Sequence, residues 1–352
     1  MASVTFIGVG KLGLAYAAFI ASKGHQVHCI DVNSKMIESY KSGDYGTAEP
    51  GVKELASSFP MTFSDDYASI VPGSICIILV NTPTCLAGYD HSMLESALAL
   101  SMGADQKATI VTSTVQPGFC DRHPGVIYNP LFVQIGNVLE NLGAVTDILI
   151  GSPELAPDLE DFYKSLFGAA RLHVMGYKEA EVAKLALNSF ITTKIAFANM
   201  IGDALRSSGL PAEPALEFIG SDPRVGTRCL KYGWGFGGPC FPRDNRALST
   251  FLREAGSYDY LPLAAHESNE RHAVEQAKHY EGTVMTGMCY KDGCDVPVVE
   301  ESHKVKTALI LKSMGRPVQI QDTPEIMALL PKELIHDNSV RNATGMGGHV
   351  AE

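Results

Sequence analysis

The sequence lacks the cysteine spacing of a metal site. Its cysteines form no CxxC pair and have no histidines at the spacing of zinc ligands: Cys29, Cys76, Cys85, Cys120, Cys229, Cys240, Cys289 and Cys294. We therefore expect neither a zinc nor an iron–sulfur site. Scattered thiols are typical of a reducing compartment. The first residues run directly into a strand pattern and lack the features of a signal peptide, so we expect a cytoplasmic protein.

The sequence also lacks an excess of positive charge and a long apolar run. Its net charge of −11 argues against nucleic acid or an anionic membrane as a partner. The most apolar long stretch, residues 185–205, contains Lys194 and Asp203, so no membrane span is expected. A length of 352 residues, with 45% hydrophobic and 19% charged residues, indicates an ordinary globular chain of two or three domains.

A dinucleotide-binding pattern opens the chain. A β-branched and aromatic run at 4–8 leads into GVGKLG, a helical pattern follows at 12–22, and a second strand at 26–30 ends in an acid. This spacing predicts a glycine turn that brings a pyrophosphate to a helix N-terminus, while the acid binds the ribose of NAD and repels the 2′-phosphate of NADP. The residues assigned to this site are Gly8, Gly10, Lys11, Leu12, Gly13 and Asp31.

Strand and helix patterns then alternate, which predicts a parallel sheet in an α/β fold. The expected strands are 75–80, 109–112, 126–128 and 148–150, and the expected helices are 34–41 and 91–102. Two strands end in the polar motifs NTPT (81–84) and STVQPG (113–118). Ligands bind at the carboxyl ends of parallel strands, so we expect the cofactor crevice to include Thr82, Pro83, Thr84, Ser113 and Thr114.

A long helix is predicted over residues 177–208. It exceeds the usual length of a globular helix, so we expect it to cross between domains or to form a dimer interface. Lys184 and Asn188 stand four residues apart and therefore share a face of this helix. The simpler interpretation is that Lys184 pairs with Glu181 on the surface.

The stretch KYGWGFGGPCFPRD at 231–244 contains a cysteine between two prolines. Glycine permits unusual backbone conformations and proline fixes φ, so this loop can hold one side chain in place. A reactive thiol needs a nearby cation and a base or acid, and Asp244 stands four residues after Cys240. The alternative is a buried structural cysteine, but we favour Cys240 as a nucleophile.

Together these motifs resemble the UDP-glucose/GDP-mannose dehydrogenase family. The matching segments are GVGKLG, AEPG (48–51), NTPT, STVQPG, EVAKLALNSF (181–190), KIAFAN (194–199), DPRVG (222–226) and GWGFGGPCFPRD (233–244). The resemblance implies an NAD-dependent enzyme that oxidises the C6 alcohol of a nucleotide sugar to a carboxylate in two steps. It also implies an N-terminal Rossmann domain, a long central helix with a helical dimerisation region, and a Rossmann-like C-terminal domain, which is truncated here.

The resemblance also implies a role for each catalytic residue. Cys240 would form a thiohemiacetal and then a thioester, while Lys184 and Asn188 stabilise negative charge on the reacting oxygen. Asp244 would assist proton transfer with a water that Thr114 helps to hold. The substrate-binding residues implied are Phe132, Lys184, Asn188, Arg224, Tyr232, Phe236, Gly237 and Lys291, of which Arg224 would reach the substrate of the neighbouring subunit in a homodimer.

One segment departs from the family pattern. Residues 129–136 read NPLFVQIG, so Leu131 and Ile135 stand where the family usually has glutamates that support thioester hydrolysis. Neither side chain can move a proton, and Gln134 can orient a water but cannot act as its base. Hydrolysis of the thioester is therefore the step that this departure affects.

We predict an NAD-binding domain at 1–176, a central helical and dimerisation domain at 177–281 that carries the cysteine loop, and a shortened nucleotide-sugar-binding domain at 282–352 with a flexible tail after Leu330. Two alternatives to a nucleotide-sugar 6-dehydrogenase stay open. One is a related oxidoreductase acting on another primary alcohol, such as a nucleoside derivative, with altered thioester hydrolysis. The other is a non-catalytic nucleotide-binding homologue.

Overall fold

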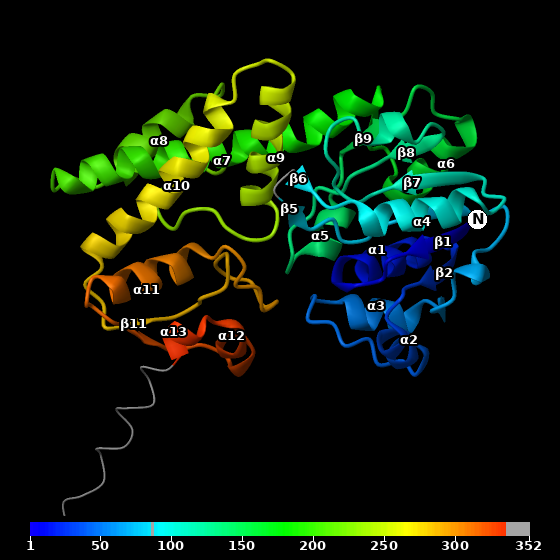
Figure 1. Ribbon diagram of the computed structural model, residues 1–352, viewed down its shortest axis with the longest axis horizontal. Helices are drawn as coiled ribbons and strands as arrows, with labels where there is room; N and C mark the ends of the chain where they lie inside the picture. The colour runs from blue at the N-terminus through cyan, green and yellow to red at the C-terminus, as the bar shows by residue number, and fades with distance from the viewer. Residues whose placement is uncertain (86–87, 336–352) are drawn as a thin grey trace, which may run out of the picture. The chain divides into compact units, whose positions relative to one another are not determined.

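The structure, a computed structural model, describes residues 1–85 and 88–335. Its internal contacts divide the chain into two compact units, the first ending at Lys184 and the second beginning at Leu185. This boundary falls within helix α7 (Tyr177–Ser207), which is labelled in Figure 1. Of the tail predicted to be flexible after Leu330, residues 332–335 form helix α13 (Lys332–Ile335), and the part beyond residue 335 lies outside the described residues.

Within the described residues, the first unit contains an eight-stranded sheet. In spatial order its strands are β10 (Arg171–Met175), β9 (Asp147–Gly151), β8 (Val126–Tyr128), β7 (Ala108–Val111), β4 (Ile75–Ile78), β1 (Ser3–Ile7), β2 (Gln26–Ile30) and β3 (Thr62–Ser64). Chain order reverses between β1 and β4, and in such sheets ligands bind beside the carboxyl ends of the strands at the reversal. The expectation of an entirely parallel sheet is wrong at one pair, because β8 and β9 meet antiparallel.

The central strands are buried on both faces. Successive residues of β4 alternate between two hydrophobic cores, Ile75 and Ile77 in one, Cys76 and Ile78 in the other. This alternation follows from the two-residue period of a strand. The helices of this unit are α1 (Lys11–Ser22), α2 (Ser34–Lys41), α3 (Val52–Ser58), α4 (Ser92–Met102), α5 (Val138–Gly143) and α6 (Pro157–Phe167). A short antiparallel pair, β5 (Thr84–Cys85) with β6 (Gly88–Tyr89), stands apart from the sheet.

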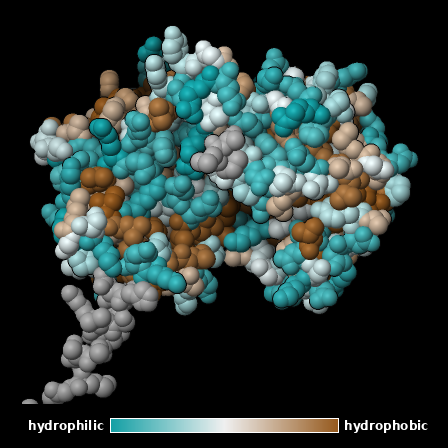
Figure 2. All heavy atoms as spheres, in the orientation of Figure 1, coloured by the Kyte–Doolittle hydropathy of each residue, from teal (hydrophilic) through white to brown (hydrophobic). Residues whose placement is uncertain are grey.

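The second unit is mainly helical. After α7 come α8 (Glu213–Ser221), α9 (Phe241–Glu254) and α10 (Tyr260–His279). Its last part contains β11 (Val284–Met285), α11 (His303–Ser313), β12 (Gln319–Ile320), α12 (Pro324–Leu329) and α13 (Lys332–Ile335), with β11 and β12 paired in parallel. Apolar side chains gather on the surface near α11 (Figure 2), where several members of the local core are only partly buried. No helix within the described ranges is long and apolar enough to cross a membrane.

Candidate cofactor and cysteine sites

The glycine turn after β1 needs its glycines for space. Gly8 has a φ of +91°, and a Cβ there would lie 2.3 Å from the carbonyl oxygen of Leu79. A Cβ at Gly13 would lie 1.9 Å from the carbonyl oxygen of Gly8, whereas one at Gly10 would meet nothing within 4 Å. Gly10 caps α1, whose first turn has no capping side chain and no acid. The turn therefore offers free helix N–H groups beside open space, which fits a pyrophosphate.

Asp31 follows β2 and is fixed beside this turn. Its Oδ2 accepts a hydrogen bond from the backbone N–H of Val9 at 2.9 Å, and its Oδ1 accepts one from Asn33 N–H at 3.0 Å. The first-turn residues Lys11 and Leu12 are exposed and half-buried, respectively. A carboxylate held at the end of β2 fits the ribose of an adenine dinucleotide.

Hydroxyl groups join the loops that follow β4 and β7. The Ser113 hydroxyl binds both backbone groups of Val80, accepting from its N–H at 2.9 Å and donating to its carbonyl at 2.7 Å. Thr82 donates to the carbonyl of Thr114 at 2.8 Å. Ser113 and Thr82 are thus buried ties between two predicted cofactor loops. Of the other residues predicted to line the cofactor crevice, Thr114 is half-buried, whereas Pro83 and Thr84 are exposed.

Glu181 is a functional candidate that sequence reasoning missed. Its buried carboxylate accepts hydrogen bonds from the backbone N–H groups of Gly118, at 2.5 Å, and Cys120, at 2.7 Å. Burial raises the pKa of this carboxyl group. A surface pair of Glu181 with Lys184 is therefore wrong, and Glu181 instead anchors the STVQPG loop to α7. Its place four residues before the apolar Leu185, and so on the same face of the predicted helix, was the available signal.

Lys184 is buried and faces the segment that departs from the family pattern. Its Nζ donates to the carbonyl of Leu131 at 2.8 Å and lies 4.3 Å from the centre of the Phe132 ring. A carboxylate also reaches this segment, since both oxygens of buried Glu49 accept from the N–H of Gly136, at 2.8 and 3.0 Å. Glu49 belongs to the AEPG motif, for which the sequence suggested no role.

In the second unit, Cys240 caps the N-terminus of α9 and is exposed, so the interpretation as a buried structural cysteine is wrong. The backbone N–H of Asp244 donates to the carbonyl of Cys240 at 2.8 Å. The Asp244 side chain is fully buried, and its Oδ2 accepts from Asn188 Nδ2 at 2.6 Å. Arg243 lies beside the other oxygen, with Nε at 3.3 Å. One turn of α9 therefore carries the thiol, the carboxylate and, through Asn188, a tie to α7.

Three predicted substrate residues lie in the loop before Cys240. Phe236 is buried. Gly237 is packed so closely that a Cβ there would lie 2.3 Å from the carbonyl oxygen of Glu301. The Tyr232 hydroxyl donates to Asp203 Oδ1 at 3.0 Å.

Three further predicted substrate residues, Arg224, Lys291 and Phe132, are more exposed. Arg224 pairs with Asp222 two residues before it in the same loop, Nε to Oδ1 at 3.0 Å and an amino group to Oδ2 at 2.7 Å. Lys291 is half-buried in the loop after β11, and Phe132 is 39% exposed. All three stand where a ligand has access to them.

The fold and the glycine turn define a dinucleotide-binding protein. The family model described as UDP-glucose/GDP-mannose dehydrogenase family, NAD binding domain, matches residues 2–167, and the central-domain model of the same family matches residues 178–271. The chain belongs to the UDP-glucose/GDP-mannose dehydrogenase family. It is an NAD-dependent oxidoreductase that acts on a CH–OH group, of the nucleotide-sugar dehydrogenase type.

Named relatives cover most of the chain. UDP-glucose 6-dehydrogenase TuaD of Bacillus subtilis is 28% identical over 369 residues, covering 95% of this chain and 79% of the relative. A UDP-glucose 6-dehydrogenase of Pseudomonas aeruginosa is 29% identical over 327 residues, covering 82% and 72%. Among solved structures, a UDP-glucose dehydrogenase from Pyrobaculum islandicum superposes with a TM-score of 0.82 at 28% identity, covering 95% of this chain and 85% of the other.

Proposed function

We propose that this enzyme is an NAD-dependent nucleotide-sugar 6-dehydrogenase that oxidises a UDP-glucose-like substrate to the uronate through a covalent intermediate on Cys240. The observation that carries the covalent step is the place of Cys240, exposed at the N-terminus of α9 with Asp244 one turn further on. A helix N-terminus favours a thiolate, because the helix dipole is positive there. The names of the relatives support the substrate class.

NAD⁺, held by the glycine turn and Asp31, would supply the hydride acceptor for each of the two oxidations. The first oxidation converts the primary alcohol to an aldehyde and releases a proton. The Cys240 thiolate then adds to the aldehyde carbon, and the new oxygen takes up a proton to give a thiohemiacetal. The second oxidation removes the hydrogen on that carbon as hydride, together with the hydroxyl proton, and leaves a thioester. Water cleaves the C–S bond, releasing the carboxylate and restoring the thiol.

The neighbouring side chains supply charge and proton transfer in this proposal. The Lys184 ammonium and the Asn188 amide donate hydrogen bonds to the reacting oxygen as negative charge develops on it. Asp244, held by Asn188 at 2.6 Å, exchanges a proton with the attacking water, and Thr114 helps to hold that water. The substrate contacts in the proposal are those predicted from the sequence: Phe132, Arg224, Tyr232, Phe236, Gly237 and Lys291.

One observation favours a second candidate function, in which the oxidation does not end at the free acid. Leu131 and Ile135 occupy the segment that Lys184 faces, and neither can move a proton. Slow hydrolysis would leave a long-lived thioester, or would release the aldehyde after a single oxidation. The substrate would then be a related primary alcohol whose oxidation need not reach the acid.

The test counts NADH per substrate and weighs the intact protein in the same samples, across UDP-glucose, UDP-N-acetylhexosamines, GDP-mannose and simple nucleosides. We expect two NADH per substrate in the wild type. We expect Cys240→Ser to lose the second oxidation and the mass adduct, because serine gives no thioester. Cys229→Ser, at another exposed cysteine of the same unit, is the matched control and should keep both.

Full four-electron oxidation by Cys240→Ser would contradict the covalent step. One NADH per substrate in the wild type, or an adduct that persists after substrate is exhausted, would favour the second candidate function. For the assembly and its location we propose a cytoplasmic homodimer, in which Arg224 reaches the substrate of the partner subunit.

A further inference from the structure

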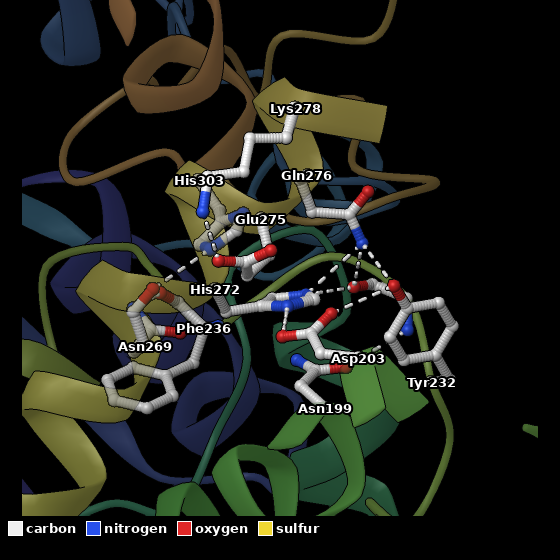
Figure 3. A network of polar contacts seen from close by, with 11 residues as sticks. Asn199, Asp203, Tyr232, Phe236, Asn269, His272, Glu275, Gln276, Lys278 and His303 are labelled. Carbon is white, nitrogen blue, oxygen red and sulfur yellow. Dashed lines mark hydrogen bonds and ion pairs between the residues drawn. The ribbon is translucent and has the colours of Figure 1, made fainter. Parts of the chain in front are cut away.

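The glycine-rich loop before Cys240 is held by side chains of α7 and α10. At Gly233 the backbone N–H donates to Asn199 Oδ1 at 3.1 Å. The carbonyl of Gly233 faces His272 Nε2 at 2.6 Å and accepts from Gln276 Nε2 at 3.3 Å. Figure 3 shows these side chains converging on the loop from their two helices. The backbone groups of an irregular loop thus find partners in side chains rather than in a sheet.

The side-chain amide of Asn269 binds both backbone groups of one loop residue, Phe236. Its Oδ1 accepts from the backbone N–H of Phe236 at 2.9 Å, and its Nδ2 donates to the carbonyl of the same residue at 2.9 Å. The side-chain amide therefore pairs with one residue as a neighbouring β-strand would. Asn269 is 2% exposed, so losing the amide would leave two buried backbone groups without these partners.

His272 lies between the carboxylate of Asp203 and the backbone of the loop. Its Nδ1 lies 2.8 Å from Asp203 Oδ2, and its Nε2 lies 2.6 Å from the Gly233 carbonyl. Each ring nitrogen therefore lies beside an oxygen atom, and the ring joins a carboxylate on α7 to the backbone of the loop. Asp203 also accepts from the Tyr232 hydroxyl at 3.0 Å. One carboxylate thus fixes both the histidine and the aromatic residue next to Gly233.

The loop fits its supports closely. A Cβ on Gly235 would lie 2.2 Å from Asn269 Oδ1 and 2.3 Å from His303 Cδ2. Beyond Phe236, the N–H of Gly238 donates to the carbonyl of Glu300 at 3.0 Å, and Cys240 follows two residues later. A shift at Gly233 or Phe236 is therefore passed along a short, packed stretch to the thiol.

We propose that Asn269, His272 and Asp203 are positioning residues for Cys240. They act through the backbone of Gly233 and Phe236, which they hold in the conformation that presents the thiol at the start of α9. The proposal rests on the nucleophilic role of Cys240 given above. The proposal also predicts that these residues hold the loop in place, which does not depend on the role of Cys240. The holding of the loop and the role of the thiol can therefore be tested separately.

The sequence provides a probe in the right place, because its single tryptophan, Trp234, lies in this loop. Acrylamide quenching of Trp234 fluorescence measures how mobile the loop is. The rate at which iodoacetamide alkylates Cys240, mapped by peptide mass, measures the accessibility and reactivity of the thiol. The variants are Asn269→Ala, the conservative Asn269→Asp, His272→Leu, His272→Gln and Asp203→Asn. Glu275→Gln is the control, since Glu275 lies on α10 but pairs with exposed Lys278 at 2.7 Å.

We expect Asn269→Ala and His272→Leu to increase Trp234 quenching, to change the alkylation rate, and to lower kcat by about 100-fold, the cost of misplacing a reacting group by about 1 Å. Because the cofactor turn lies in the first unit, KM for NAD⁺ should stay within about twofold. Partial unfolding would also leave KM unchanged, so kcat is calculated per folded protein, with the folded fraction measured by circular dichroism. Asn269→Asp keeps an acceptor for the Phe236 N–H, and His272→Gln keeps a donor for the Gly233 carbonyl. Each should therefore have a higher kcat than the variant that loses both hydrogen bonds at its position. Glu275→Gln should match the wild type.

Unchanged quenching, alkylation and kcat in folded Asn269→Ala and His272→Leu would overturn the proposal. So would a loss of kcat that only follows the folded fraction, measured by circular dichroism, without partial recovery in Asn269→Asp and His272→Gln. If Trp234 and the thiol respond as expected but Cys240→Ser still completes both oxidations, the loop is held as proposed and the covalent role of Cys240 is what fails.

Discussion

At the scale of single residues, one carboxylate links cofactor choice to the glycine turn. Asp31 binds two backbone N–H groups with two different oxygens, so its orientation is fixed before any ligand arrives. A fixed carboxylate can accept hydrogen bonds from ribose hydroxyls without losing side-chain freedom on binding. The same charge repels a 2′-phosphate, because the two negative groups would share one small site. We therefore expect cofactor preference to depend on the charge of Asp31 more than on its shape.

Asp31→Asn should separate charge from shape. The amide oxygen can keep one of the two backbone hydrogen bonds, while the charge is lost. We expect kcat/KM for NAD⁺ to fall by about 10- to 100-fold, the value of a hydrogen bond to a charged group, and the NADP⁺/NAD⁺ ratio of kcat/KM to rise. Steady-state kinetics with both cofactors measures this. Asp44→Asn, at an exposed acid of the same unit, is the control, and an unchanged cofactor ratio in Asp31→Asn would show that the carboxylate does not set the choice.

At the scale of elements, periodicity predicted most of the first unit because its strands and helices each bury a regular face. Strand direction was not readable in this way, since an apolar run such as 148–150 has the same pattern in either direction, and β9 runs antiparallel to β8. Helix α9 was missed because it begins within the glycine- and proline-rich loop, although proline in a first helical turn is itself a start signal. Helix α13 forms at Lys332–Ile335, within the part of the chain that was predicted to be a flexible tail.

The residues of the sites divide in the same manner. Cys240, Asn188 and Asp244 became candidates from spacing and resemblance, because each stands in a recognisable motif. Glu181 and Asn269 were not, since both bind backbone N–H groups of segments distant in sequence. Such contacts depend on tertiary packing and leave no local pattern.

Between α10 and α11, one buried histidine should make stability depend on pH. His303 is 1% exposed, and burial together with the charge of His272 lowers its pKa to about 4. Its Nε2 lies 3.2 Å from the carbonyl of Asn269, which fits a neutral ring that donates there. Because unfolding restores the ordinary affinity for a proton, the stability due to neutral His303 is complete above about pH 6.5 and is lost as pH falls towards 4.

We expect His303→Gln, which keeps a donor towards Asn269 but does not titrate in this range, to lose less stability on acidification than the wild type. The difference between the two proteins should be about 1 kcal/mol between pH 7.5 and 5.5. Urea unfolding followed by Trp234 fluorescence measures it in the unit that contains His303. His279→Gln, near the end of α10, controls for removal of a histidine. Equal pH dependence in wild type and His303→Gln would show that His303 is not the titrating group.

At the scale of the whole molecule, the second unit presents apolar side chains to solvent. Along α7, Phe190 is 65% exposed, Phe197 40% and Met200 51%, and Phe218 on α8 is 80% exposed. The three α7 residues follow one another at intervals of seven and three, which places them on one side of the helix. Clustered exposed apolar residues on helices are typical of interfaces between protein chains. We therefore assign the proposed homodimer contact to this side of α7 and to α8.

The double substitution Phe190→Asp with Phe218→Asp should abolish the dimer, because a contact that is isologous would bury each new charge twice. Light scattering should change from twice the 37.8 kDa of one chain to a single chain. Phe59→Asp, at a 36% exposed phenylalanine of the first unit, should leave the mass unchanged. A monomeric wild type, or a double variant that stays dimeric, would refute this assignment.

If Arg224 acts on the partner's substrate, the monomeric variant should also lose activity to the level of Arg224→Ala, and adding Arg224→Ala to it should have no further effect. Additive losses would place Arg224 at the substrate of its own subunit instead.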